Sequence, residues 1–156
     1  MLEQGAFDVI LLDIHGVGQK ESKEQGFGLL KHLRASSPAQ VVIAYSNADW
    51  GLKYQEFFDM ADAKLDKRAD YVDFKRVVDQ QLQRRFTLDF YLERILKVAG
   101  TTVSDSGRLR KVSSEAILSG NLERLERFLS TNISTPDVIN ILIGIAQIAI
   151  GLKSLS

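Results

Sequence analysis

No cysteine occurs anywhere in this chain of 156 residues. Such a sequence can form no disulfide, no thiolate metal site and no cysteine nucleophile. The lack of cysteine fits a reducing compartment, so we expect a cytoplasmic location. The opening residues, Met1 to Gly5, contain no basic segment followed by an apolar core, so they predict no secretory signal.

The chain also lacks an excess of either charge. Twenty Lys and Arg residues balance twenty Asp and Glu residues, and the formal net charge is zero. A dedicated nucleic-acid-binding protein usually has a basic excess or patch that neutralises phosphates. The balance therefore argues against nucleic acid as a partner. A hydrophobic share of 45% and a charged share of 26% are ordinary for a globular protein of one domain plus an extension.

The sequence also has no uninterrupted apolar run long enough to span a membrane. The stretch from Val138 to Leu152 is almost wholly apolar, but Asn140 and Gln147 interrupt it and it falls short of the about 20 residues that a membrane span needs. This argues against a membrane helix. Its aliphatic residues follow a spacing close to a heptad seam, which predicts packing on another helix, within the chain or in a homodimer. The seam comprises Val138, Ile141, Leu142, Ile145, Ile148, Ala149 and Leu152.

The first half of the chain shows an alternation of strand and helix patterns. Short apolar runs typical of buried parallel strands cover 7–12 and 41–45, and a weaker one covers 61–65. Helical patterns cover 27–34, a stretch with Tyr54, Phe57 and Phe58, and 72–82. This alternation predicts an α/β fold with a parallel sheet of about three strands and right-handed crossovers.

A polar residue follows each of these predicted strands, namely Asp13, Ser46 and Lys67. The carboxyl ends of parallel strands meet at one edge of a sheet, so we expect these side chains to converge on one crevice. Asp13 could then accept a phosphoryl group as a nucleophile, while Lys67 offsets the charge and Ser46 donates a hydrogen bond. The simpler alternative is that Asp13 caps its strand and the other two are ordinary loop residues.

This order resembles the later half of a bacterial response-regulator receiver domain, over roughly 7–82. Receivers have an Asp after the third strand, a Ser or Thr after the fourth and a Lys after the fifth. Here the separations are 33 positions from Asp13 to Ser46 and 21 from Ser46 to Lys67. The resemblance implies a flavodoxin-like sheet without its first βαβ unit, with Asp13 as phosphoacceptor. It implies phosphorelay signalling with a histidine kinase or phosphotransfer protein, rather than a turnover enzyme.

Three departures from the receiver pattern qualify this resemblance. The acidic pair that helps receivers hold Mg²⁺ is missing, so the implied Mg²⁺ site has Asp13 alone and is incomplete. Lys64 stands at the position of the aromatic switch residue, and Arg68 replaces the customary Pro. The chain is then either a fragment of a longer receiver or a degenerate one, including a pseudo-receiver that binds partners without phosphorylation. Without its first unit, the strand before Asp13 becomes an edge that could pair in a homodimer or be covered by a partner.

A second resemblance leads to a different activity. The segment from Leu11 to Val17 looks like the first motif of haloacid-dehalogenase-type phosphatases, which use Asp-x-Asp-Gly after a strand. In that family Asp13 would be the nucleophile. His15 stands where the second Asp, the general acid and base, belongs. A phosphatase is therefore the second alternative.

The receiver resemblance ends after Leu82, and we expect two regions: an α/β unit over 1–85 and an all-α extension over 86–156. The pattern predicts a helix over 86–96 that runs to Gly100, and a polar linker over 101–107. It also predicts a helix that begins near Ser113, another over 121–129, and a last helix opened by Ser134-Thr135-Pro136. The last two predicted helices should form a hairpin.

Overall fold

The computed structural model describes residues 7–15, 25–47 and 55–154. The chain divides into two compact units, Met1–Arg85, called here the α/β unit, and Phe86–Ser156, called the helical unit. Three strands and seven α-helices occur among the described residues. The predicted α/β class with a three-stranded parallel sheet is confirmed. The helical position predicted for Tyr54 lies outside the described residues.

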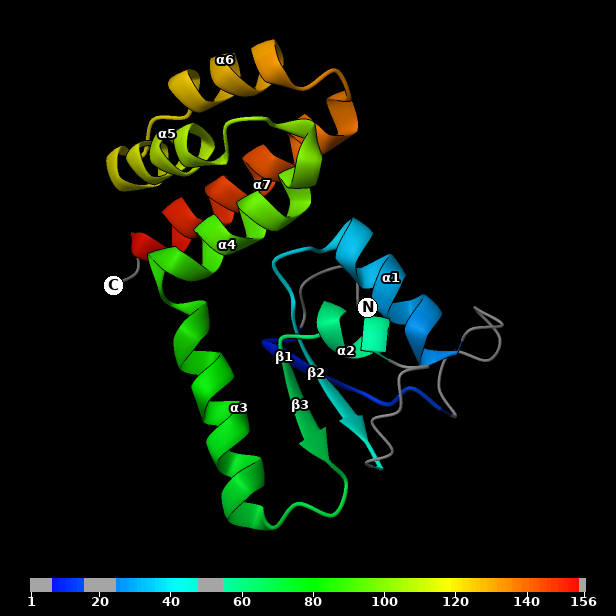
Figure 1. The fold of residues 1–156 in the computed structure, drawn as a ribbon. Coiled ribbons are helices and arrows are strands. Elements are labelled where there is room, and N and C mark those ends of the chain that lie inside the picture. Colours follow the sequence, from blue (N-terminus) through cyan, green and yellow to red (C-terminus); the bar gives the residue numbers. More distant parts are fainter. Residues whose placement is uncertain (1–6, 16–24, 48–54, 155–156) are drawn as a thin grey trace. The chain divides into compact units, whose positions relative to one another are not determined.

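The α/β unit alternates strands and helices (Figure 1). Its elements are β1 (Val9–Leu12), α1 (Gly26–Ser36), β2 (Val41–Ser46), α2 (Gln55–Met60), β3 (Ala63–Asp66) and α3 (Tyr71–Arg85). The strands are parallel and their order is β1-β2-β3, so β1 forms one edge of the sheet that the structure describes. In register, Leu12 is level with Ala44, and Ser46 with Asp66.

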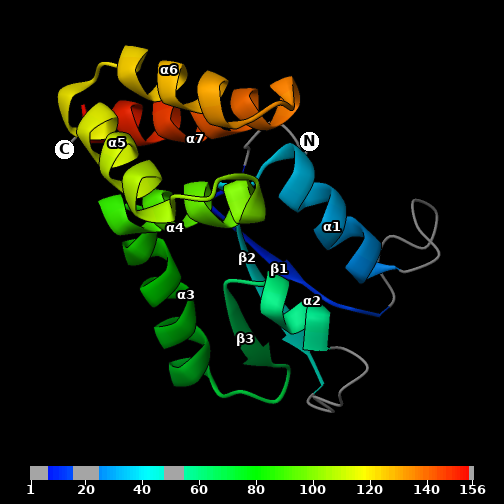
Figure 2. The ribbon, with the colours of Figure 1, turned by 45° about the horizontal axis from the view of Figure 1, so that its top comes forward.

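Side-chain alternation gives the sheet two apolar faces. On one face, α1 and α2 pack over alternate residues of β1 and β2 (Figures 1 and 2). This core contains Ile10, Leu12, Ile14, Leu30, Leu33, Val42, Ala44, Phe57 and Phe58. Val41 and Ile43 alternate to the other face, where α3 contacts all three strands, and both are fully buried. Burial of each large aliphatic side chain stabilises the fold by roughly 1.5–3 kcal/mol.

One charged residue ties the amino end of the sheet together. Arg34 on α1 donates to the Met60 carbonyl from Nε (2.9 Å), to the Gln40 carbonyl from Nη1 (2.7 Å) and to Asp62 Oδ2 from Nη2 (2.9 Å). Asp62 Oδ2 also accepts the backbone N–H of Val42 at 2.9 Å. The Arg34 and Asp62 side chains are only 11% and 7% exposed. These contacts hold the first residues of β2 and β3 in place. They thereby help to set the positions of the carboxyl ends of both strands.

The helical unit contains four α-helices and one 3₁₀ turn among its described residues. They are α4 (Leu88–Ala99), η3 (Gly100–Thr102), α5 (Ser106–Ser119), α6 (Glu123–Asn132) and α7 (Pro136–Lys153). Helix α4 packs on α5 and α7, and α5 and α6 both contact α7. The apolar core contains the aromatic residues Phe90 and Tyr91 and many aliphatic ones, including Ile95, Leu109, Leu125, Leu129, Leu142 and Ile145, none of these six more than 1% exposed.

Two details of the helical unit correct the sequence-based predictions. Helix α5 begins at Ser106 rather than near Ser113, because Asp105 caps it: Asp105 Oδ1 accepts the backbone N–H of Arg108 at 2.8 Å. The predicted linker 101–107 is thus largely a 3₁₀ turn and this cap. Ser113 lies inside α5 and is fully buried. Helix α7 does open with Pro136, but Thr135 makes no side-chain capping hydrogen bond.

Helix α7 has mixed surroundings. Leu142, Ile145 and Ala149 of the predicted seam are buried in the helical unit, whereas Ile148 is 47% exposed. The helix is long and apolar enough to cross a membrane by length and composition, with a mean hydropathy of 1.4. Core helices of soluble proteins also meet this criterion.

Candidate functional site

The structure brings Asp13 and Lys67 into direct contact at the carboxyl edge of the sheet. Asp13 directly follows β1, and Lys67 directly follows β3. Lys67 Nζ donates to Asp13 Oδ2 and forms an ion pair with it. Because β2 lies between β1 and β3, this contact joins the two outer strands across the central one. The side chains are 21% (Asp13) and 30% (Lys67) exposed, so water and ions can still reach the pair.

Local backbone contacts hold the Asp13 carboxylate and main chain in place. The backbone N–H of His15 donates to Asp13 Oδ1 at 3.3 Å. The first turn of α1 passes close to the backbone of Asp13, and the N–H of Gly26 donates to the Ile14 carbonyl at 3.3 Å. A Cβ atom at Gly26 would collide with the carbonyl oxygen of Asp13. Only glycine fits this approach, which the sequence pattern could not reveal because it depends on tertiary packing.

Ser46 lies at the end of the central strand but is not joined to Asp13 by a hydrogen bond in the described part of the chain. Its side chain is buried, and its hydroxyl makes a long hydrogen bond of 3.4 Å to the Asn47 carbonyl. Its own carbonyl accepts the backbone N–H of Lys67 at 3.1 Å. Ser46 therefore positions the Lys67 backbone, and its hydroxyl is held only weakly.

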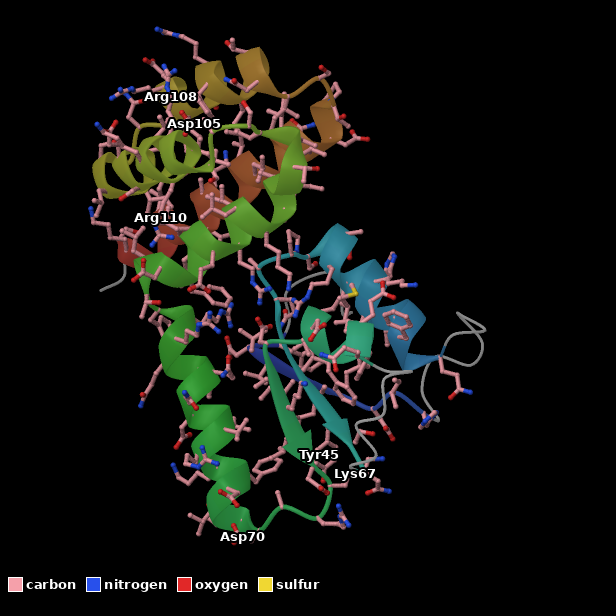
Figure 3. The ribbon with its side chains drawn as sticks, in the orientation of Figure 1. Tyr45, Lys67, Asp70, Asp105, Arg108 and Arg110 are labelled. Atoms are coloured by element: carbon pink, nitrogen blue, oxygen red, sulfur yellow. The ribbon has the colours of Figure 1, made fainter. Side chains whose placement is uncertain are left out.

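Tyr45 is a site residue that sequence reasoning missed. Lys67 Nζ lies 5.9 Å from the centroid of the Tyr45 ring. Figure 3 shows Tyr45 and Lys67 together at the ends of β2 and β3. Continuing the register of β1 and β2 by one residue places Asp13 level with Tyr45. A cation over an aromatic face is worth about 0.5–1 kcal/mol at exposed sites, so the ring helps to hold the ammonium beside Asp13.

The neighbouring carboxylate of Asp66 forms an ion pair with Arg68. Asp66 accepts hydrogen bonds from Arg68, from its backbone N–H at 2.8 Å and from Nη2 at 2.9 Å. The hydrogen bonds from the Arg68 guanidinium and backbone lower the pKa of Asp66 below its usual value. Asp66 and Arg68 form one pair, and Asp13 and Lys67 form the other.

The described residues do not make a complete magnesium site. Mg²⁺ prefers near-octahedral oxygen coordination, usually from one or two carboxylates with water and phosphate oxygens. Within 7–15, 25–47 and 55–154, no group of three or more His, Asp and Glu residues could hold a metal ion. Among the described residues, Asp13 is the carboxylate that pairs with Lys67.

No family model, no curated protein and no solved structure matches this chain.

Proposed function

We propose that the α/β unit is a receiver-type phosphorelay module in which Asp13 accepts a phosphoryl group. The observation that carries this proposal is the ion pair between Lys67 and Asp13 at the carboxyl edge of a parallel sheet. We further propose that the described strands and helices have a flavodoxin-like arrangement. The strand order β1-β2-β3, with α1 and α2 on one face and α3 on the other, supports it.

The transfer step is a displacement at phosphorus. An Asp13 carboxylate oxygen attacks the phosphorus of the donor and forms a new P–O bond. The bond from phosphorus to the leaving group breaks, and the leaving group takes its electron pair. The product is an aspartyl phosphate. Lys67, already beside the carboxylate, offsets the charge on the transferred oxygens. The Ser46 hydroxyl can turn from its long bond with Asn47 to donate to them.

Protein partners complete this proposal. The donor would be a histidine kinase or a phosphotransfer protein, and the output would be a protein–protein contact rather than turnover. The edge of β1 is a candidate contact, because β1 is an outer strand of the described sheet and Leu11 on it and Phe7 just before it are 39% and 45% exposed. Homodimerisation there predicts a concentration-dependent mass in light scattering that Leu11→Lys abolishes. A monomer at high concentration would contradict it.

Acetyl phosphate tests the phosphoacceptor directly. The full chain is incubated with acetyl phosphate, with Mg²⁺ or with EDTA, and its mass is measured. One phosphoryl group should appear on the wild type and on Asp66→Asn, but not on Asp13→Asn. Lys67→Gln should reduce labelling at least about tenfold, since one preorganised charge contributes that much or more. The proposal would be refuted if the wild type were labelled neither with Mg²⁺ nor with EDTA. It would also be refuted if Asp13→Asn were labelled as strongly as the wild type.

A pseudo-receiver is the second candidate. It is favoured because no group of three or more acidic or His side chains that could hold a metal ion occurs among the described residues. In that case Asp13→Asn would leave partner binding and oligomeric state unchanged. The phosphatase alternative stays a prediction; release of phosphate from a generic phosphomonoester that is lost in Asp13→Asn would establish it.

A further inference from the structure

The helical unit carries a cleft of about 380 Å³ between α5 and α6. Small-molecule sites are typically clefts of about 300–1,000 Å³ with an apolar lining and a few polar groups. Three arginines line this cleft: Arg108 from α5, and Arg124 and Arg127 from α6. Val112 and Phe128 supply its apolar part. An arginine side chain can bind a phosphate group through two parallel hydrogen bonds.

An aromatic contact positions one of these arginines. The guanidinium carbon of Arg108 lies 5.6 Å from the centroid of the Phe128 ring. A guanidinium that rests on a ring keeps its N–H donors at its edge, where they can bind an anion. Figure 3 places Arg108 and Arg110 on α5, and Arg110 pairs with Asp89 of α4 at 2.6 Å. Arg108 and Arg110 therefore lie on different sides of α5: Arg108 lines the cleft with α6, and Arg110 contacts α4.

The positive charge of the cleft is only partly neutralised. Arg124 forms an ion pair with Glu115. Arg108 and Arg127 form no ion pair within the described part of the chain. Glu123 precedes Arg127 by one helical turn, a spacing that often gives a pair, yet the two do not pair here. Like charges gathered in one cleft repel each other, and a bound anion would remove that cost.

We propose that this cleft binds a phosphorylated small molecule of the nucleotide class. The phosphate would be held by Arg108 and Arg127, and a flat ring would lie against the partly exposed ring of Phe128. Thr131 also lines the cleft, and its hydroxyl proton goes to the Arg127 carbonyl (2.8 Å), so its oxygen can accept from a sugar hydroxyl. The site is independent of the phosphoryl chemistry proposed for Asp13.

The test is a titration of the ¹⁵N-labelled full chain followed by NMR. Adenosine 5′-monophosphate should shift amides of α5 and α6 around Arg108, Arg127 and Phe128. Adenosine, which lacks the phosphate, and ribose 5-phosphate, which lacks the ring, should each bind at least about tenfold more weakly, because each loses one of the two kinds of contact.

Matched variants locate the site. Arg127→Gln and Arg108→Gln should each weaken binding of the monophosphate about tenfold, the loss expected for a charge-assisted hydrogen bond. Arg110→Gln removes a positive charge from α5, the helix that carries Arg108, but Arg110 does not line the cleft. This variant should therefore bind the monophosphate as the wild type does. The proposal is overturned if Arg110→Gln weakens binding as much as Arg127→Gln, if adenosine or ribose 5-phosphate binds equally well, or if shifts are absent or occur only around Asp13 and Lys67.

Discussion

The two units of this chain place their buried charges differently. In the α/β unit, Arg34 and Asp62 are nearly buried and connect α1, β2 and the turn before β3. In the helical unit, the buried Arg94 lies over the ring of Phe90 on its own helix, 4.9 Å from its centroid. Helices satisfy their backbone hydrogen bonds locally, whereas a parallel sheet needs long-range contacts to fix its strand ends. Those strand ends are where polar side chains can gather into a site.

The largest expected effect is on the α/β unit alone. Asp62→Ala leaves Arg34 buried without its carboxylate and removes the acceptor of the Val42 N–H, which should cost about 3–5 kcal/mol. In urea, the amide NMR signals of β1 and β2 should be lost early while most helical circular dichroism persists. Asp73→Ala, which breaks an exposed pair, should change stability by less than about 0.5 kcal/mol.

The helical unit should respond to loss of aliphatic packing instead. Ile145→Ala removes a side chain that is 1% exposed, so it should destabilise this unit by about 2–5 kcal/mol. The exposed Ile148→Ala should cost less than about 0.5 kcal/mol. Far-ultraviolet circular dichroism during urea unfolding measures both. Equal effects of the two substitutions would contradict the assignment of Ile145 to the core.

A glycine-to-alanine substitution should change the stability of the two units in opposite directions. Gly26→Ala places a methyl group against the Asp13 carbonyl, which should destabilise the α/β unit by about 1–3 kcal/mol and disturb the Asp13–Lys67 pair. Gly144→Ala in α7 meets no atom within 4 Å and should stabilise the helical unit by about 1 kcal/mol. Thermal unfolding of both variants checks this, and a stabilising Gly26→Ala would show that the close approach is absent.

The smallest expected effect concerns pH. Arg68 lowers the pKa of Asp66, so this pair stabilises the fold above the unfolded-state pKa and the contribution is lost as the pH falls through the folded-state pKa. Arg68→Gln should raise the pKa of Asp66 toward its usual value. An NMR titration of the Asp66 carboxyl carbon measures the shift. An unchanged pKa in Arg68→Gln would mean that Arg68 is not its cause.

The sequence predicts the strands and two of the site residues because both follow from local pattern. An apolar run that stops at a polar residue marks the end of a parallel strand, and this places Asp13 and Lys67 at one edge. Tyr45 and Gly26 were not identified as site residues, since their roles depend on register and on the path of α1. The sequence pattern predicts the start of α5 about two turns too late, because the first turn of this helix is polar and begins with a cap.

The most direct test is to locate the phosphoryl group on the chain. Borohydride reduction after acetyl phosphate treatment converts an aspartyl phosphate to homoserine, which peptide mass spectrometry can assign to one position. The proposed function predicts conversion at Asp13, lost in Asp13→Asn and strongly reduced in Lys67→Gln, with Asp66 and Asp62 intact. Conversion at another aspartate, or none at Asp13 in the wild type, would contradict it.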